Sequence, residues 1–151
     1  MTNAREGDFW KVVSGEMPLP SVLDLLGWSV IDAEEGRVRA KFVARKEFYN
    51  PSGFVQGGML TAMLDGVMGA AAVSLLAAGE QIATLEMKVS YMQSVTNMSL
   101  IGEGRVLHRG GSVLFMEGTL TAEDGSLVAT ATATGRVVRP PSRAAGRKEA
   151  P

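Results

Sequence analysis

Apolar and polar residues alternate with a period of two along much of this chain, which is typical of strands that bury one face. One stretch alternates Val38, Ala40 and Phe42 with three basic residues. Near the C-terminus, Leu127 and three alanines share one face, with three threonines on the other. The pattern predicts two strands joined by residues 34–36, then strands at about 82–92, 98–109, 112–122 and 126–138, with a hairpin turn at Asp124-Gly125 before the last.

Two segments instead have a helical pattern. Residues 18–27 predict a short helix with Ser21 as its N-cap and Gly27 as its stop. The segment from about Gly57 to Ala78 predicts a long helix ended by Gly79. Because it is apolar on nearly every side, this helix must be enclosed by the sheet and by a second subunit. We therefore expect an α+β hotdog fold, a curled antiparallel sheet of five to six strands around one long central helix.

The chain has 151 residues, enough for one domain with a real core. We expect a single domain over residues 1–139, with a short helical segment at about 7–26. Residues 1–6 and 140–151 contain little that packs, so we expect the tail at 140–151 to be disordered.

Composition excludes several functions. Lys and Arg number 15 against 16 Asp and Glu, which leaves a formal charge of −1 and nothing that indicates binding to nucleic acid or an anionic membrane. Cysteine is absent, and His108 is the only histidine, so neither a thiolate nucleophile nor a His-rich metal site is expected. The sequence implies no cofactor and no metal.

Two features bear on location. The N-terminal residues carry charges where a signal peptide needs an apolar core, which favours a cytoplasmic protein. The segment from Met59 to Ala78 has the length of a membrane span, but Asp65 near its middle would cost roughly 2.5–3.5 kcal/mol in a bilayer. A central helix inside the protein is the better interpretation.

The same segment carries the candidate chemistry. Asp65 is a carboxylate among Met, Leu, Val and Ala, an expensive position unless the group is satisfied or used. Gly57 and Gly58 open the helix and offer free backbone N–H groups to a polar ligand. Together they indicate a site that polarises a carbonyl beside a base.

The motif Asn50-x-x-Gly53-x-x-Gln56-Gly57-Gly58, with Asp65 in the following helix, resembles the N-x-x-G-x-x-H-G-G…D signature of hotdog acyl-CoA thioesterases of the phenylacetate-degradation (PaaI-like) type. The likeness covers roughly residues 20–138, including residues 86–92 and 125–134. It implies hydrolysis of an aryl-, short- or medium-chain acyl-CoA by a homodimer, and leaves open whether two such dimers assemble as a dimer of dimers into a homotetramer.

The resemblance also implies roles for single residues. The Gly57 N–H polarises the thioester carbonyl, Asp65 acts as general base or nucleophile, and Asn50 orients the carbonyl or water. Thr84 lies where the family often has Ser or Thr near the attacking water. Gln56 departs from the family, because it replaces the commoner His and cannot carry a proton.

Geometry adds a condition to these roles. Eight residues of helix separate Gly57 from Asp65 by about 12 Å, too far for both groups of one chain to act on one thioester. Two antiparallel helices across a two-fold axis would bring Asp65 of one subunit to Gly57 of the other.

Other residues are weaker candidates for the site. Gly58, Phe54 and Met68 are expected to line an apolar substrate pocket, and Arg105 and Arg109 to reach coenzyme A phosphates, although a solvated strand end explains both arginines as well.

Purely structural roles remain as alternatives for the main site residues. These are a structural carboxylate at Asp65, a turn residue at Asn50, close packing at Gly57 and Gly58, and ordinary loop and strand residues at Gln56 and Thr84. Two functional alternatives also remain. One is a non-catalytic acyl-CoA-binding hotdog module, and the other is an enoyl-CoA hydratase or dehydratase, which lacks its usual His here.

Overall fold

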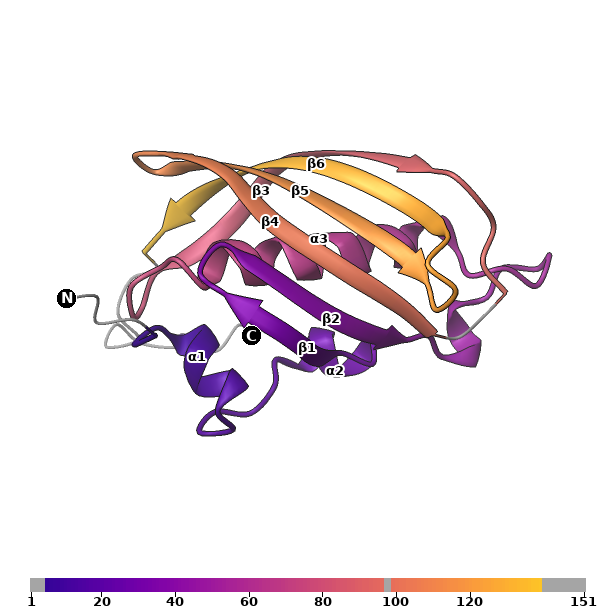
Figure 1. Ribbon diagram of the computed structural model, residues 1–151, viewed down its shortest axis with the longest axis horizontal. Coiled ribbons are helices and arrows are strands. Elements are labelled where there is room, and N and C mark those ends of the chain that lie inside the picture. The colour runs from indigo at the N-terminus through magenta and orange to yellow at the C-terminus, as the bar shows by residue number, and fades with distance from the viewer. Residues whose placement is uncertain (1–4, 97–98, 140–151) are drawn as a thin grey trace, which may run out of the picture.

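The structure is a computed structural model, and it describes residues 5–96 and 99–139. Short helices come first, then a strand hairpin, the central helix and four further strands (Figure 1). In chain order the elements are α1 (Asp8–Val13), α2 (Ser21–Leu25), β1 (Ser29–Glu34), β2 (Arg37–Val43), the 3-10 turn η1 (Lys46–Phe48), α3 (Gly57–Val73), β3 (Gln81–Tyr91), β4 (Ser99–Gly110), β5 (Val113–Ala122) and β6 (Leu127–Val138).

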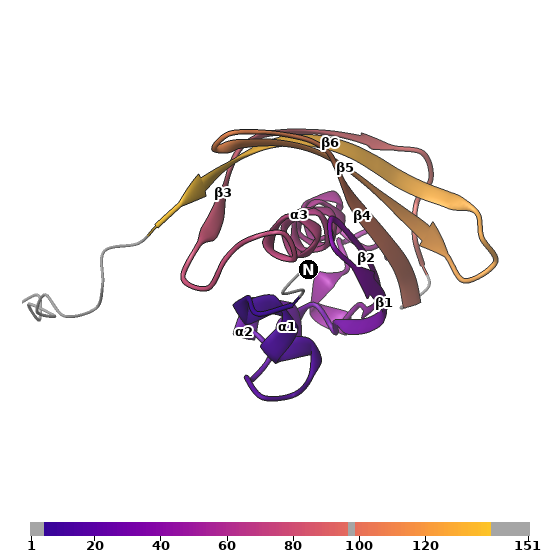
Figure 2. The same ribbon diagram turned by 60° about the vertical axis from the view of Figure 1, so that its left-hand side comes forward.

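The six strands form one antiparallel sheet in the order β1-β2-β4-β5-β6-β3. The sheet curls around α3, while α1 and α2 lie on the side of α3 turned away from β5 and β6 (Figure 2). The predicted hotdog fold is confirmed. Strands β1 and β3 are the two edges of the sheet, so β3 has one side without a partner strand among residues 5–96 and 99–139.

The predicted alternation in β2 is confirmed, because Val38, Ala40 and Phe42 are fully buried. Across the core, β4 approaches the helix closely at Gly104. A Cβ atom at Gly104 would lie 2.3 Å from the Val67 carbonyl oxygen. The glycine therefore lets α3 press directly against the middle of the sheet.

The central helix begins at Gly57 as predicted but ends at Val73, five residues before the predicted end at Ala78. Ser74 explains the early stop. Its hydroxyl donates to the Ala71 carbonyl (2.7 Å) and accepts the Gly36 N–H (2.8 Å), so the last turn of α3 is tied to the β1–β2 turn. This competition for backbone groups is typical of serine.

Two smaller predictions are wrong. Pro20 occupies the N-cap of α2 and Ser21 is its first helical residue, because the Leu23 and Asp24 N–H groups bond to the Pro20 carbonyl. Leu127 is 40% exposed, because the β5–β6 pairing is irregular next to it and Val128 is buried instead.

Two predicted turns are confirmed. Gly27, with φ of +69°, ends α2. Gly125, with φ of +85°, lies in the turn between β5 and β6. The predicted disordered tail lies outside the described residues. Within residues 5–96 and 99–139, no helix is long and apolar enough to cross a membrane.

Candidate active site

The first turn of α3 presents two free N–H donors. The Gln56 carbonyl accepts the N–H groups of Met59 (2.9 Å) and Leu60 (3.3 Å), which satisfies the third and fourth donors of the helix. In the part of the chain that the structure describes, the N–H groups of Gly57 and Gly58 have no acceptor. Such donors at a helix start favour a partly negative oxygen.

Asn50 shapes the loop that leads to this turn. Its Oδ1 atom accepts the N–H groups of Ser52 (3.0 Å) and Phe54 (3.1 Å), and Gly53 has a φ of +80°. Asn50 is therefore a turn residue. Because both partners are N–H donors, they fix the orientation of the amide, and its NH₂ group stays free to donate to a ligand.

A cavity of about 310 Å³ lies beside the free donors. Its wall combines polar groups at Asn50 and Gly57 with the apolar side chains of Phe54, Leu60 and Met92. The combination suits a ligand with one polar oxygen and an apolar part. The structure thus brings Asn50, Phe54 and Gly57 together, as predicted.

The carboxylate occupies a second position, two turns further along α3. Asp65 is half-buried rather than enclosed by apolar side chains. Its Oδ1 atom accepts the hydroxyl hydrogen of Thr84 on β3 (Oγ1 to Oδ1, 2.8 Å). Neither Asp65 nor Thr84 lines the cavity. Since Gly57 and Asp65 lie about 12 Å apart along the helix axis, one chain carries the two parts of the site separately.

Tyr91 and Thr61 make contacts at the start of α3 that the sequence analysis did not predict. The Tyr91 hydroxyl on β3 donates to the Gly57 carbonyl (3.0 Å) and also pairs with the Thr61 hydroxyl. The spacing of four residues from Gly57 to Thr61 to Asp65 places all three on one face of the helix, and this spacing was a usable signal.

Three other candidates are not part of this cluster. The Gln56 side chain is exposed and has no hydrogen bond among the described residues. Met68 is fully buried in the core, against Gly118 of β5. The Arg109 guanidinium donates to the Leu75 carbonyl (3.0 Å), beyond the opposite end of α3.

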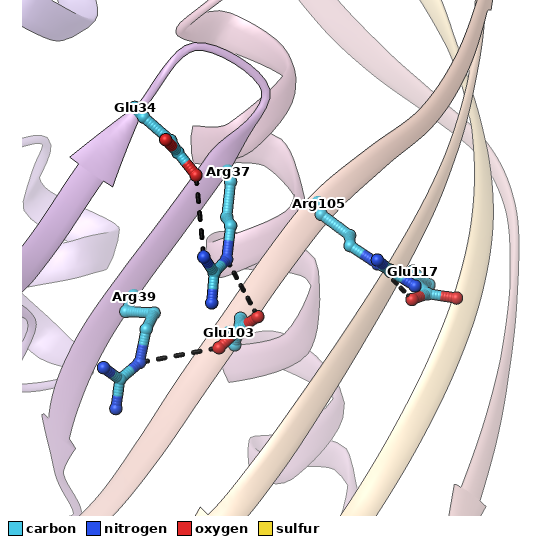
Figure 3. Close-up of polar contacts among 6 residues, drawn as sticks. All are labelled: Glu34, Arg37, Arg39, Glu103, Arg105 and Glu117. Carbon is cyan, nitrogen blue, oxygen red and sulfur yellow. Dashed lines mark hydrogen bonds and ion pairs between the residues drawn. The ribbon is translucent and has the colours of Figure 1, made fainter.

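Arg105 lies on the outer face of the sheet. Its neighbour Gly104 faces α3, so the Arg105 side chain points away from the helix, where it forms an ion pair with Glu117 (Figure 3). Further ion pairs on this face join Arg37 and Arg39 to Glu103. The hydrogen bond that Arg37 donates to the Glu103 carboxylate raises the pKa of Arg37 above its ordinary value. This face is a network of mutually satisfied charges. His108 is exposed.

Comparison with known proteins places this geometry in a family. Residues 52–129 match the family model of the thioesterase superfamily, and the chain belongs to that superfamily. It is accordingly a hydrolase that acts on thioesters.

Individual relatives agree with this assignment. A phenylacetic acid degradation-related protein from Ralstonia eutropha JMP134 is 38% identical, with a TM-score of 0.80 over 85% of this chain and 98% of that one, which confirms the PaaI-like resemblance. A Streptococcus mutans UA159 protein solved with acetyl-CoA is 26% identical, with a TM-score of 0.68 over 74% and 89%. A Saccharolobus solfataricus protein, provisionally assigned as an esterase, is 28% identical over 78% of this chain and 84% of its own.

Proposed function

We propose that this protein hydrolyses the thioester of an aryl-, short- or medium-chain acyl-CoA to a free acid and coenzyme A, at sites that two subunits build together. One observation carries the proposal: α3 holds two unpaired N–H donors beside a cavity at its start and, two turns later, a carboxylate fixed by Thr84. These are the groups that hydrolysis of a thioester requires.

The reaction starts with the thioester oxygen on the Gly57 N–H, where negative charge develops as the carbonyl carbon is attacked. With Asp65 as general base, the carboxylate removes a proton from water while the water oxygen bonds to that carbon. The C–S bond then breaks, and the thiolate of coenzyme A takes the proton back from Asp65. Because a thiolate is a good leaving group, the reaction tolerates Gln56 at the position where the family commonly has His. With Asp65 as nucleophile, the carboxylate would displace the thiolate of coenzyme A to form an acyl-enzyme anhydride. Water would then hydrolyse the anhydride to the free acid and Asp65, and the thiolate would take up the proton released.

The accessory roles follow from the hydrogen bonds. Thr84 holds one carboxylate oxygen and leaves the other for water or for attack. The Asn50 amide, whose oxygen is used in its own loop, donates its N–H₂ hydrogens toward the substrate carbonyl.

The second subunit supplies the missing half of each site. Strand β3 has a free side, and Asp65 on the face of α3 beside it is only half-buried. A two-fold axis at this edge would lay two α3 helices antiparallel, with Asp65 of one subunit opposite Gly57 of the other. Assembly of such dimers into a tetramer stays a prediction.

The ligand class is supported by the acetyl-CoA bound to the Streptococcus mutans relative. The apolar wall of the cavity at Phe54, Leu60 and Met92 supports an apolar acyl or pantetheine segment there. Contacts from Arg109 to the phosphates of coenzyme A would require the guanidinium to leave the Leu75 carbonyl. Arg105 would have to leave Glu117 in the same way.

The test is a panel of acetyl-, hexanoyl-, benzoyl- and phenylacetyl-CoA incubated with the purified protein and a thiol reagent. Release of free coenzyme A that is lost in Asp65→Asn supports hydrolysis. Tight binding without release would instead indicate an acyl-CoA-binding module, and consumption of an enoyl-CoA without release would indicate a hydratase.

A further inference from the structure

The first turn of α3 lacks the usual means of holding a helix start in place. Gln56 occupies the N-cap position but makes no side-chain cap hydrogen bond. The next two residues are Gly57 and Gly58, which have the greatest backbone freedom of any residue. A catalytic donor must nevertheless stay within about 0.5 Å of its working position. Another group has to fix this turn.

The Tyr91 side chain reaches the turn from β3. Its hydroxyl lies 3.0 Å from the Gly57 carbonyl oxygen, and a carbonyl can only accept, so Tyr91 is the donor. In its short contact with Thr61, Tyr91 is therefore the acceptor and the Thr61 hydroxyl is the donor. The proton positions of both hydroxyl groups are thus determined.

The Tyr91 ring also depends on glycine at position 57. A Cβ atom at Gly57 would lie 3.3 Å from Tyr91 Cζ, closer than ordinary van der Waals contact. The ring therefore lies directly against the backbone of the first turn and forms part of the cavity wall next to the donor.

We propose that Tyr91 is a positioning residue, which fixes the peptide between Gly57 and Gly58 so that the free N–H groups stay directed at the substrate oxygen. The inference rests on the proposed function. The Gly57 carbonyl and the Gly58 N–H belong to one peptide, so a hydrogen bond donated to that carbonyl polarises the N–H and makes it a stronger donor. Tyr91 thus orders the first turn, which carries the Gly57 N–H, and strengthens its second free donor, the Gly58 N–H.

In this arrangement Tyr91 donates its hydroxyl hydrogen to the Gly57 carbonyl, so its part in the site is to hold the turn. The residue is also half-exposed, with 51% of its surface accessible, so its hydroxyl is not needed to satisfy the core. Loss of the hydroxyl should therefore alter catalysis more than folding.

The test is Tyr91→Phe, which keeps the ring and removes only the hydroxyl. Loss of one hydrogen bond that orders the donor should lower kcat about 5- to 10-fold and change KM less than about twofold. The backbone order parameter of Gly58, measured by 15N relaxation NMR, should fall in the variant. The control is Thr61→Val, which keeps the bond from Tyr91 to Gly57 and should lower kcat less.

Wild-type kcat and an unchanged order parameter at Gly58 in Tyr91→Phe would overturn the proposal. A loss of kcat that is matched by an equal rise in KM, or by a large fall in melting temperature, would also overturn it, since those results indicate a structural role. If the wild-type protein releases no coenzyme A, the proposed function fails instead. The order parameter at Gly58 then decides alone whether Tyr91 orders the turn.

Discussion

Thr84 donates its hydroxyl hydrogen to the Asp65 carboxylate, with 2.8 Å between Oγ1 and Oδ1. The bond links the edge strand β3 to the third turn of α3. It is the sole hydrogen bond to this carboxylate within residues 5–96 and 99–139. One carboxylate oxygen is thereby fixed, and the other can act on water or on the substrate.

Replacement of Thr84 tests this link. Thr84→Val keeps the shape of the side chain but removes the donor, so the carboxylate loses its fixed orientation. We expect kcat/KM to fall about 10-fold or more, the range of a hydrogen bond to a charged group. Thr84→Ser keeps the hydroxyl and should retain most of the activity. Equal activity of the Val variant and the wild type would show that Thr84 is an ordinary strand residue.

Removal of the Gly57 N–H tests the donor. Gly57 is the first helical residue, where proline is tolerated, and Gln56 before it has a ψ of 134°, which suits a residue that precedes proline. Gly57→Pro should lower kcat/KM about 10²- to 10³-fold, the usual effect of losing one oxyanion donor. Gly57→Ala is the matched control, because it adds a Cβ atom near Tyr91 but keeps the N–H. An equally large loss of kcat/KM in Gly57→Ala would show that crowding against Tyr91, and not loss of the N–H, lowers the activity.

Packing between the sheet and α3 depends on Gly104. Gly104→Ala would place its Cβ atom 2.3 Å from the Val67 carbonyl oxygen, and neither backbone can move away freely. We expect the free energy of unfolding to fall by about 3 kcal/mol, as in a strongly overpacked core. On the same strand, Gly110→Ala meets only ordinary contact with His108 at 3.5 Å and should be close to neutral. Chemical denaturation of both variants measures the difference.

The hairpin between β5 and β6 should respond to acid. The Ser126 hydroxyl (2.7 Å) and N–H (2.9 Å) bond to Asp124 and lower its pKa below the ordinary value of 3.8. A depressed pKa stabilises the fold above the unfolded value, and the contribution disappears as pH falls through the folded value. In melting curves from pH 7 to pH 2, Asp124→Asn should be less stable than wild type at pH 7 and equal to it at the acid end. A difference that is constant with pH would contradict this account.

The sequence predicted most of the fold because its signals are local. Strands that bury one face repeat every two residues, so the positions around Val38 and Phe42 were visible without a structure. The C-terminal end of α3 was not predictable from a local pattern. Ser74 ends the helix through a bond to Gly36, which lies far away in the sequence and is placed there only by the folded sheet.

The candidate site shows the same difference between local and long-range signals. Asn50, Gly57 and Asp65 belong to one contiguous motif and were found from it. The partners of Gly57 and Asp65 come from β3, so the bond from Tyr91 to Gly57 follows only from the way β3 packs on α3. The position of Arg105 also depends on long-range structure, because its pairing with Glu117 on the outer face follows from the β4–β5 register.

The central claim is that each site combines Gly57 of one subunit with Asp65 of the other. Gly57→Pro and Asp65→Asn chains, carrying different affinity tags, can be co-expressed and the mixed dimers purified through both tags. A mixed dimer contains one site with both groups intact, so it should hydrolyse acyl-CoA at about half the wild-type rate, although each variant alone is nearly inactive. Mixed dimers no more active than the two single variants would contradict a site shared between subunits.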